Sequence, residues 1–176
     1  MEKDLQMSQS KRLYTIGLLV AAGAFLTSCV WVQSPPGTTT TVILLRHAEQ
    51  ADPEFVLTEQ GFARSQELHA ALEDLDIDVI YSPAYDHNLQ TIQPLVEQRE
   101  IALQVIKPTN VALKIVHDNP GKTVLWVGNE GNLKATYRQL GGREAPPLAY
   151  GEILIMTIAE TGPPEIETRR FGPVAS

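Results

Sequence analysis

The chain has 176 residues, of which 43% are hydrophobic, and it carries a formal net charge of −7. This composition indicates a globular protein with one domain of ordinary size and excludes a largely disordered chain. The acidic balance excludes a nucleic-acid partner, because binding to phosphate backbones requires concentrated lysine and arginine. The single cysteine, Cys29, excludes an intramolecular disulfide.

The first thirty residues have the pattern of a secretory signal. Lys11-Arg12 precedes an uncharged apolar run that ends at Cys29. The segment Leu26–Cys29 resembles the lipobox of bacterial lipoproteins, in which the cysteine is diacylated and becomes the mature N-terminus. This resemblance implies a signal peptide over residues 1–28 and a lipid anchor in the membrane at Cys29. The alternative is an uncleaved anchor helix over Leu13–Val32, a run long enough to span a bilayer.

Either interpretation places the domain in the bacterial cell envelope. Val30, and no aspartate, follows the cysteine, which by the enterobacterial sorting pattern favours the outer membrane, facing the periplasm. Pro35-Pro36-Gly37 and the threonines after it predict a flexible linker over residues 29–40. The folded domain is then expected over residues 41–176.

Strands and helices are predicted to alternate along this domain. Thr41–Arg46 is continuously apolar and rich in β-branched residues, which is typical of a strand buried on both faces of a parallel sheet. Residues 57–78 show helical spacing after a possible N-cap at Thr58. Further strands are predicted at Asp78–Pro83, Ala102–Ile106, 122–131, 151–160 and 165–171, and further helices at 87–98 with a kink or break at Pro94, at 109–121 and at 132–142.

This alternation predicts an α/β domain, a three-layer α/β/α sandwich with a mainly parallel sheet. In such sheets, ligands bind beyond the carboxyl ends of the strands. Arg46-His47 and Gly128-Asn129 both follow predicted strands. We therefore expect these residues to meet at one edge of the sheet and to form a site there.

Four segments in order resemble the histidine phosphatase superfamily, which includes the phosphoglycerate mutases. They are "LLRHAE", "LTEQGFARSQEL", "VIYSPAYDHNLQTIQPL" and "TVLWVGNEGNLKATYRQLGG". In this family a histidine attacks phosphorus, a phosphohistidine forms and water hydrolyses it. The resemblance implies that His47 is the nucleophile and that Arg46 binds the phosphoryl group. It implies no cofactor, and nothing in the spacing demands a metal.

The other family positions depart from the pattern. The second arginine corresponds to His87 if one residue is inserted after Pro83, and to Asp86 by a rigid count. The second histidine corresponds to Asn129, which can donate a hydrogen bond but cannot carry a positive charge. His87 and Asn129 are therefore expected to contact the substrate as altered helpers.

The acid that protonates the leaving oxygen has no clear counterpart. Glu49 beside the nucleophile is one candidate, and Glu130 is another. Arg64, Arg138 or Arg143 is a possible replacement for the missing positive charge.

Loss of one preorganised donor from such a site costs roughly 10²–10³ in rate. The leading hypothesis is therefore a degenerate site that binds a phosphorylated small molecule or another anionic envelope ligand with weak or no hydrolysis. An active phosphomonoesterase working through phospho-His47, with an envelope phosphosugar as a plausible substrate, is the first alternative. A non-catalytic scaffold is the second.

Overall fold

The computed structural model describes residues 31–172. The predicted signal peptide over 1–28 and the predicted lipidation site at Cys29 lie outside these residues. Within residues 31–172, no helix combines the length and the apolar character needed to cross a membrane.

Six strands form one sheet in the order β3-β2-β4-β1-β5-β6. The first four in this order are parallel neighbours, β5 is antiparallel to β1, and β6 is antiparallel to β5. The mainly parallel sheet predicted from the sequence is therefore confirmed. The strands are β1 (Thr40–Arg46), β2 (Val79–Ser82), β3 (Ala102–Val105), β4 (Thr123–Gly128), β5 (Glu152–Ile158) and β6 (Glu165–Arg170).

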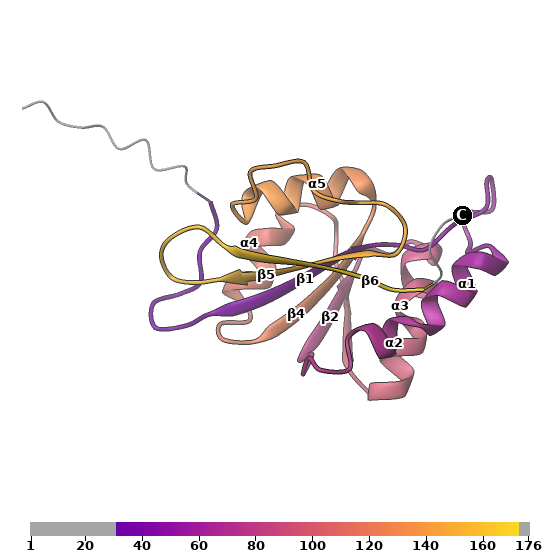
Figure 1. Cartoon of the computed structure of the whole chain (residues 1–176), viewed down its shortest axis with the longest axis horizontal. Coiled ribbons are helices and arrows are strands. Elements are labelled where there is room, and N and C mark those ends of the chain that lie inside the picture. Colours follow the sequence, from indigo (N-terminus) through magenta and orange to yellow (C-terminus); the bar gives the residue numbers. More distant parts are fainter. Residues whose placement is uncertain (1–30, 173–176) are drawn as a thin grey trace, which may run out of the picture.

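Helices cover both faces of this sheet, as Figure 1 shows. They are α1 (Glu59–Gln66), α2 (Leu68–Ala71), α3 (Asp86–Arg99), α4 (Val111–His117) and α5 (Glu130–Gln139). Alternate residues of β1 enter opposite cores, because successive side chains of a strand point to opposite faces. Ile43 belongs to the same buried core as Ile92 of α3, whereas Leu44 belongs to the core that contains Ile115 of α4. The predicted three-layer sandwich is thus confirmed.

The helix expected over residues 57–78 is broken. Thr58 caps α1 as predicted, since its side chain accepts a hydrogen bond from the amide of Gly61. The chain then turns at Glu67, whose amide bonds back to Arg64, and α2 is a single short turn. Leu68 still reaches the core, but Phe62 is 46% exposed. The apolar spacing therefore identified the buried face, although the backbone is not one helix.

The interior proline of α3 does not end the helix. Pro94 lies within Asp86–Arg99, and the helix continues for more than a turn beyond it. The predicted break at Pro94 is therefore wrong. A proline removes only one amide donor and crowds one preceding carbonyl, and the rest of the helix continues past it.

The segment that precedes β1 is docked on the domain. The amide of Val32 donates to the carbonyl of Gln139 at 2.7 Å, and the Ser34 hydroxyl donates to the carbonyl of Ile158 at 2.7 Å. The indole of Trp31 donates to the carbonyl of Gly162 at 3.1 Å. Over residues 31–40, these contacts do not fit the expected flexible linker. The proline and threonine content drove that expectation, whereas the apolar Trp31 and Val32 anchor the segment.

Candidate active site

The carboxyl ends of β1 and β4 bring together the residues predicted to form the site. Arg46 lies beside Gly128 in the parallel register, and the His47 amide donates to the Gly128 carbonyl at 3.1 Å. Asn129 follows at the start of α5, and His87 comes from the first turn of α3. The expected convergence of Arg46, His47, His87 and Asn129 at one edge of the sheet is therefore what the structure shows.

His47 is buried and held in one tautomer. Its ring nitrogen Nδ1 lies 2.8 Å from the carbonyl oxygen of Ala48, and its side chain is only 3% exposed. Since a carbonyl can only accept, Nδ1 carries the hydrogen and Nε2 keeps the lone pair. Burial, together with the nearby His87 and Arg46, lowers the pKa of His47 to about 4. The imidazole is thus neutral at pH 7, the state that a nitrogen nucleophile requires.

His87 lies directly against this nucleophile candidate. The two ring centroids are 4.3 Å apart and the planes meet at 61°. Nδ1 of His87 lies 3.0 Å from the carbonyl oxygen of Phe55, and the amide nitrogen of Asn129 lies 3.5 Å from Nε2 of His87. His87 and Asn129 therefore form a polar bridge beside the His47 ring.

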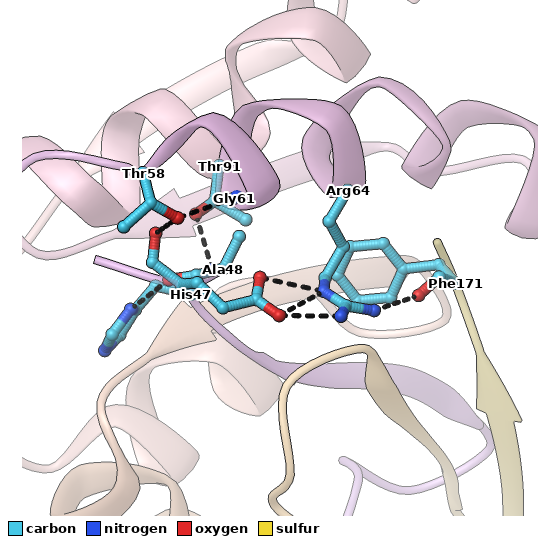
Figure 2. Close-up of polar contacts among 8 residues, drawn as sticks. His47, Ala48, Thr58, Gly61, Arg64, Thr91 and Phe171 are labelled. Carbon is cyan, nitrogen blue, oxygen red and sulfur yellow. Dashed lines mark hydrogen bonds and ion pairs between the residues drawn. The ribbon is translucent and has the colours of Figure 1, made fainter. Parts of the chain in front are cut away.

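A threonine of α3 fastens His87 to the loop that carries His47. The hydroxyl of Thr91 accepts from the amide of Ala48 at 2.9 Å and donates to the carbonyl of His87 at 2.7 Å. Figure 2 shows this threonine above the Ala48 amide. One fully buried hydroxyl thus sets the position of α3 relative to the nucleophile loop.

Arg46 is held by protein groups. Its guanidinium lies over the ring of Tyr150, 4.3 Å from the centroid, and donates to the carbonyl of Leu148 and the hydroxyl of Tyr150, each at 3.4 Å. The Glu130 carboxylate lies 3.7 Å away. Within the part of the chain that the structure describes, the buried Nε of Arg46 has no hydrogen-bond acceptor. Buried donors are rarely left without an acceptor, so this N–H is a candidate contact for an anion.

A cleft of about 480 Å³ opens beside His87. This volume lies within the range of small-molecule sites. Its lining consists of Gln50, Glu54, Phe55, Ala84, Tyr85, Asp86, His87 and Asn129. Among the residues described, no group of three or more metal-ligating side chains gathers at this cleft or elsewhere.

No protein-family model matches the chain, and no curated protein matches its sequence. Solved structures do match. The protein histidine phosphatase SixA complexed with tungstate aligns over 74% of this chain and 96% of its own, with 18% identity and a TM-score of 0.61. The phosphoglycerate mutase of Plasmodium falciparum aligns over 79% of this chain and 97% of its own, with 17% identity and a TM-score of 0.52. A mutant phosphoserine phosphatase of Entamoeba histolytica in complex with phosphoserine aligns over 76% of this chain and 96% of its own, with 18% identity and a TM-score of 0.55. The chain has the histidine-phosphatase fold.

In this histidine-phosphatase fold, Glu49 forms a structural ion pair with Arg64. Both of its carboxylate oxygens accept from Arg64, at distances between 2.6 and 3.0 Å, and Arg64 also donates to the carbonyl of Phe171 (Figure 2). Burial by itself would raise the pKa of Glu49, but the hydrogen bonds and charge of Arg64 outweigh it and lower the pKa. The structure therefore gives no support to Glu49 as the proton donor that the sequence offered.

The other candidates for a missing charge also lie elsewhere in the histidine-phosphatase fold. Arg64 is committed to Glu49, and the guanidinium of Arg143 lies 5.8 Å from the Trp31 ring. Arg138 is in the last turn of α5, at the end away from His47. Glu130 does lie near the site, where it pairs with Arg46 and with Lys134. It is exposed, and Lys134 holds its pKa below the usual value, so it is poorly suited to donate a proton at neutral pH.

Several site residues escaped the sequence analysis, among them three aromatic ones. Tyr150 contacts both Arg46 and His47, with its ring centroid 5.8 Å from that of His47. Phe55 and Tyr85 line the cleft. Tyr150 lies in a loop that matches none of the four segments resembling the family, and no local signal assigns it to the site. Nor does the sequence around Phe55 show that this side chain is exposed.

Proposed function

We propose that this protein binds a phosphorylated or other anionic small molecule beside His47 and hydrolyses it weakly or not at all. The observation that carries this proposal is the contact between His47 and His87: a neutral nucleophile is present, but a second ring covers it. Arg46, His87 and Asn129 can donate hydrogen bonds to a bound anion, but they carry less positive charge than an efficient phosphatase needs.

Several groups at this edge favour an anion. The helices α3 and α5 both begin here, and helix N-termini carry a partial positive charge and free amide groups. Arg46 contributes a full charge and the unpartnered Nε described above. In the similar structures, SixA is complexed with tungstate and the Entamoeba enzyme with phosphoserine. These likenesses concern the fold, and the ligand chemistry is part of the proposal.

The second candidate function is an active phosphomonoesterase. The low pKa of His47 favours it, because the imidazole needs no deprotonation before it attacks. Nε2 would form a bond to phosphorus while the bond from phosphorus to the leaving oxygen breaks, and water would then hydrolyse the phosphohistidine. Neither Glu49 nor Glu130 is placed to protonate the leaving oxygen, which is why binding with weak hydrolysis is preferred.

The same proposal includes location at a bacterial envelope membrane through a lipid on Cys29. The support is the sequence pattern of residues 11–29. The test is Cys29→Ser in the full chain, followed by membrane fractionation and metabolic labelling with a fatty acid. Loss of label and release from the membrane are expected, whereas an unlabelled, uncleaved chain in both forms would favour the spanning helix.

Calorimetry with inorganic phosphate and with vanadate tests the binding function directly. We expect both anions to bind the parent protein and His47→Ala to weaken binding at least tenfold. His117→Ala is the matched control, because this exposed histidine lies at the end of α4. Hydrolysis of an aryl phosphate is measured on the same samples. Rapid turnover that His47→Ala abolishes would favour the phosphomonoesterase, and no anion binding by any sample would leave only a scaffold.

A further inference from the structure

The mouth of the cleft carries two exposed aromatic rings. Phe55 is 54% exposed and Tyr85 is 45% exposed, and both line the cleft beside His87. Aromatic side chains lose favourable burial when they stay in water, so two at one opening mark a binding surface more often than a plain solvent face.

Both rings are positioned by the histidine that covers the nucleophile candidate. The ring of Tyr85 is stacked on that of His87, with centroids 5.8 Å apart and planes at 10°. The carbonyl of Phe55 lies 3.0 Å from Nδ1 of His87, and Phe55 has a φ of 54°, in the left-handed region that bulky residues seldom adopt. His87 therefore belongs both to the histidine pair and to the cleft wall, and the cleft begins where a phosphoryl group beside His47 would end.

The charged side chains at this mouth are acidic. Glu54 and Asp86 line the cleft, and within the described part of the chain its lining contains neither lysine nor arginine. Arg46 is not part of this lining, and its guanidinium pairs with Glu130. The mouth therefore repels a second anionic group on a ligand and attracts a cationic one.

We propose that this cleft receives the organic cation of a zwitterionic phosphomonoester, of the type in which a quaternary ammonium group is carried by the phosphorylated alcohol. The phosphoryl group lies toward His47 and Arg46, and the cation lies between Phe55, Tyr85 and the two carboxylates. Quaternary ammonium groups suit this setting, because aromatic faces attract them and they keep little hydration. This inference rests on the proposed function and adds to it the class of ligand.

The test compares two phosphate esters of matched shape. Phosphocholine carries the cation, and 3,3-dimethylbutyl phosphate replaces its nitrogen by carbon. Calorimetry is expected to show phosphocholine binding about fivefold more tightly than the neutral isostere. In the double variant Tyr85→Leu with Glu54→Gln this ratio should fall close to one. A general attraction between the acidic protein and the less negative ester would persist in the variant. A fall in the affinity ratio therefore shows that the cation binds in the cleft.

The matched control is the double variant Phe62→Leu with Glu73→Gln, which removes one exposed ring and one exposed carboxylate elsewhere. It should keep the parent ratio, and circular dichroism should show all three proteins equally folded. Binding of inorganic phosphate, measured alongside, tests the anion-binding function separately from the cation site. If phosphate binds but the ratio does not change in the cleft variant, the cation site is wrong and the proposed function stands. If neither phosphate nor either ester binds, the proposed function fails and this inference fails with it.

Discussion

The ring of His87 meets the ring of His47 edge to face, with the two centroids 4.3 Å apart. His87, which the family resemblance aligned with an arginine, therefore packs directly against the nucleophile candidate. Whether the site turns over substrate depends on this pair more than on the Arg46-His47 motif itself.

Restoring the expected family residues should restore hydrolysis. His87→Arg combined with Asn129→His would uncover His47 and supply a fixed positive charge and a second imidazole. We expect the rate of aryl phosphate hydrolysis to rise at least about 10²-fold, the effect of one preorganised donor. The comparison is the same double variant with His47→Ala, which should return to the background rate. An unchanged rate in a folded double variant that still binds phosphate would show that another group limits the reaction.

Protonation of His47 should reduce stability at acid pH. The pKa of its side chain is about 4 in the folded chain, against 6.5 for an ordinary histidine. Between these values the unfolded chain binds more protons than the folded one, so the free energy of unfolding falls as the pH drops from about 6.5 to 4, and this contribution levels off below 4. Urea unfolding at several pH values measures it.

A His47→Gln variant provides the reference for that experiment. It removes the titrating group, so its loss of stability over the same pH range should be smaller than that of the parent. His117→Ala, measured alongside, controls for the loss of an exposed imidazole. Coincident curves for parent and His47→Gln would mean that His47 does not titrate with a lowered pKa.

Loss of Arg64 should be costly. Arg64→Met leaves the Glu49 carboxylate, whose side chain is 14% exposed, without its partner. Breaking a buried pair in this way costs about 3–5 kcal/mol in the free energy of unfolding. Arg169→Met removes a partner of the exposed Asp74 and should cost much less, because exposed ion pairs contribute little. Equal losses in the two variants would contradict the structural role assigned to the Glu49 pair.

A glycine of α1 allows this helix to approach the loop after His47. A Cβ on Gly61 would lie 2.2 Å from the backbone oxygen of Glu49, so Gly61→Ala forces the helix away. We expect a loss of about 1–3 kcal/mol, typical of overpacking. Gly131→Ala in α5 meets nothing within 4 Å and should instead stabilise the protein by up to about 1 kcal/mol. Thermal melting of both variants measures the contrast, and a neutral Gly61→Ala would show that α1 has room to move.

The sequence was sufficient for the architecture because apolar runs and helical spacing are local signals. Thr41–Arg46 reads as a buried strand, and β1 spans Thr40–Arg46. A parallel sheet then carries Arg46, His47 and Asn129 to one edge, so their proximity also followed from the pattern. The placement of His87 followed from the family resemblance with one inserted residue.

What the sequence did not reveal depends on side chains that meet across long separations. Glu49 looked like a proton donor because it follows His47, but its partner Arg64 lies on the next helix and decides its role. Tyr150 reaches Arg46 from a loop more than a hundred residues away. Spacing along the chain carries no information about such contacts, and the docking of Trp31 on Gly162 is of the same kind.

The docked segment before β1 fixes which way the molecule would face. Trp31 and Val32 contact the end of α5 and the turn after β5, whereas His47 directly follows the end of β1. The segment before β1 and the end of β1 lie at opposite ends of this strand (Figure 1). If Cys29 carries the proposed lipid, one residue, Val30, separates it from the docked Trp31. The opening beside His87 would then point outward from the bilayer, toward dissolved solutes and away from the headgroups of its own leaflet.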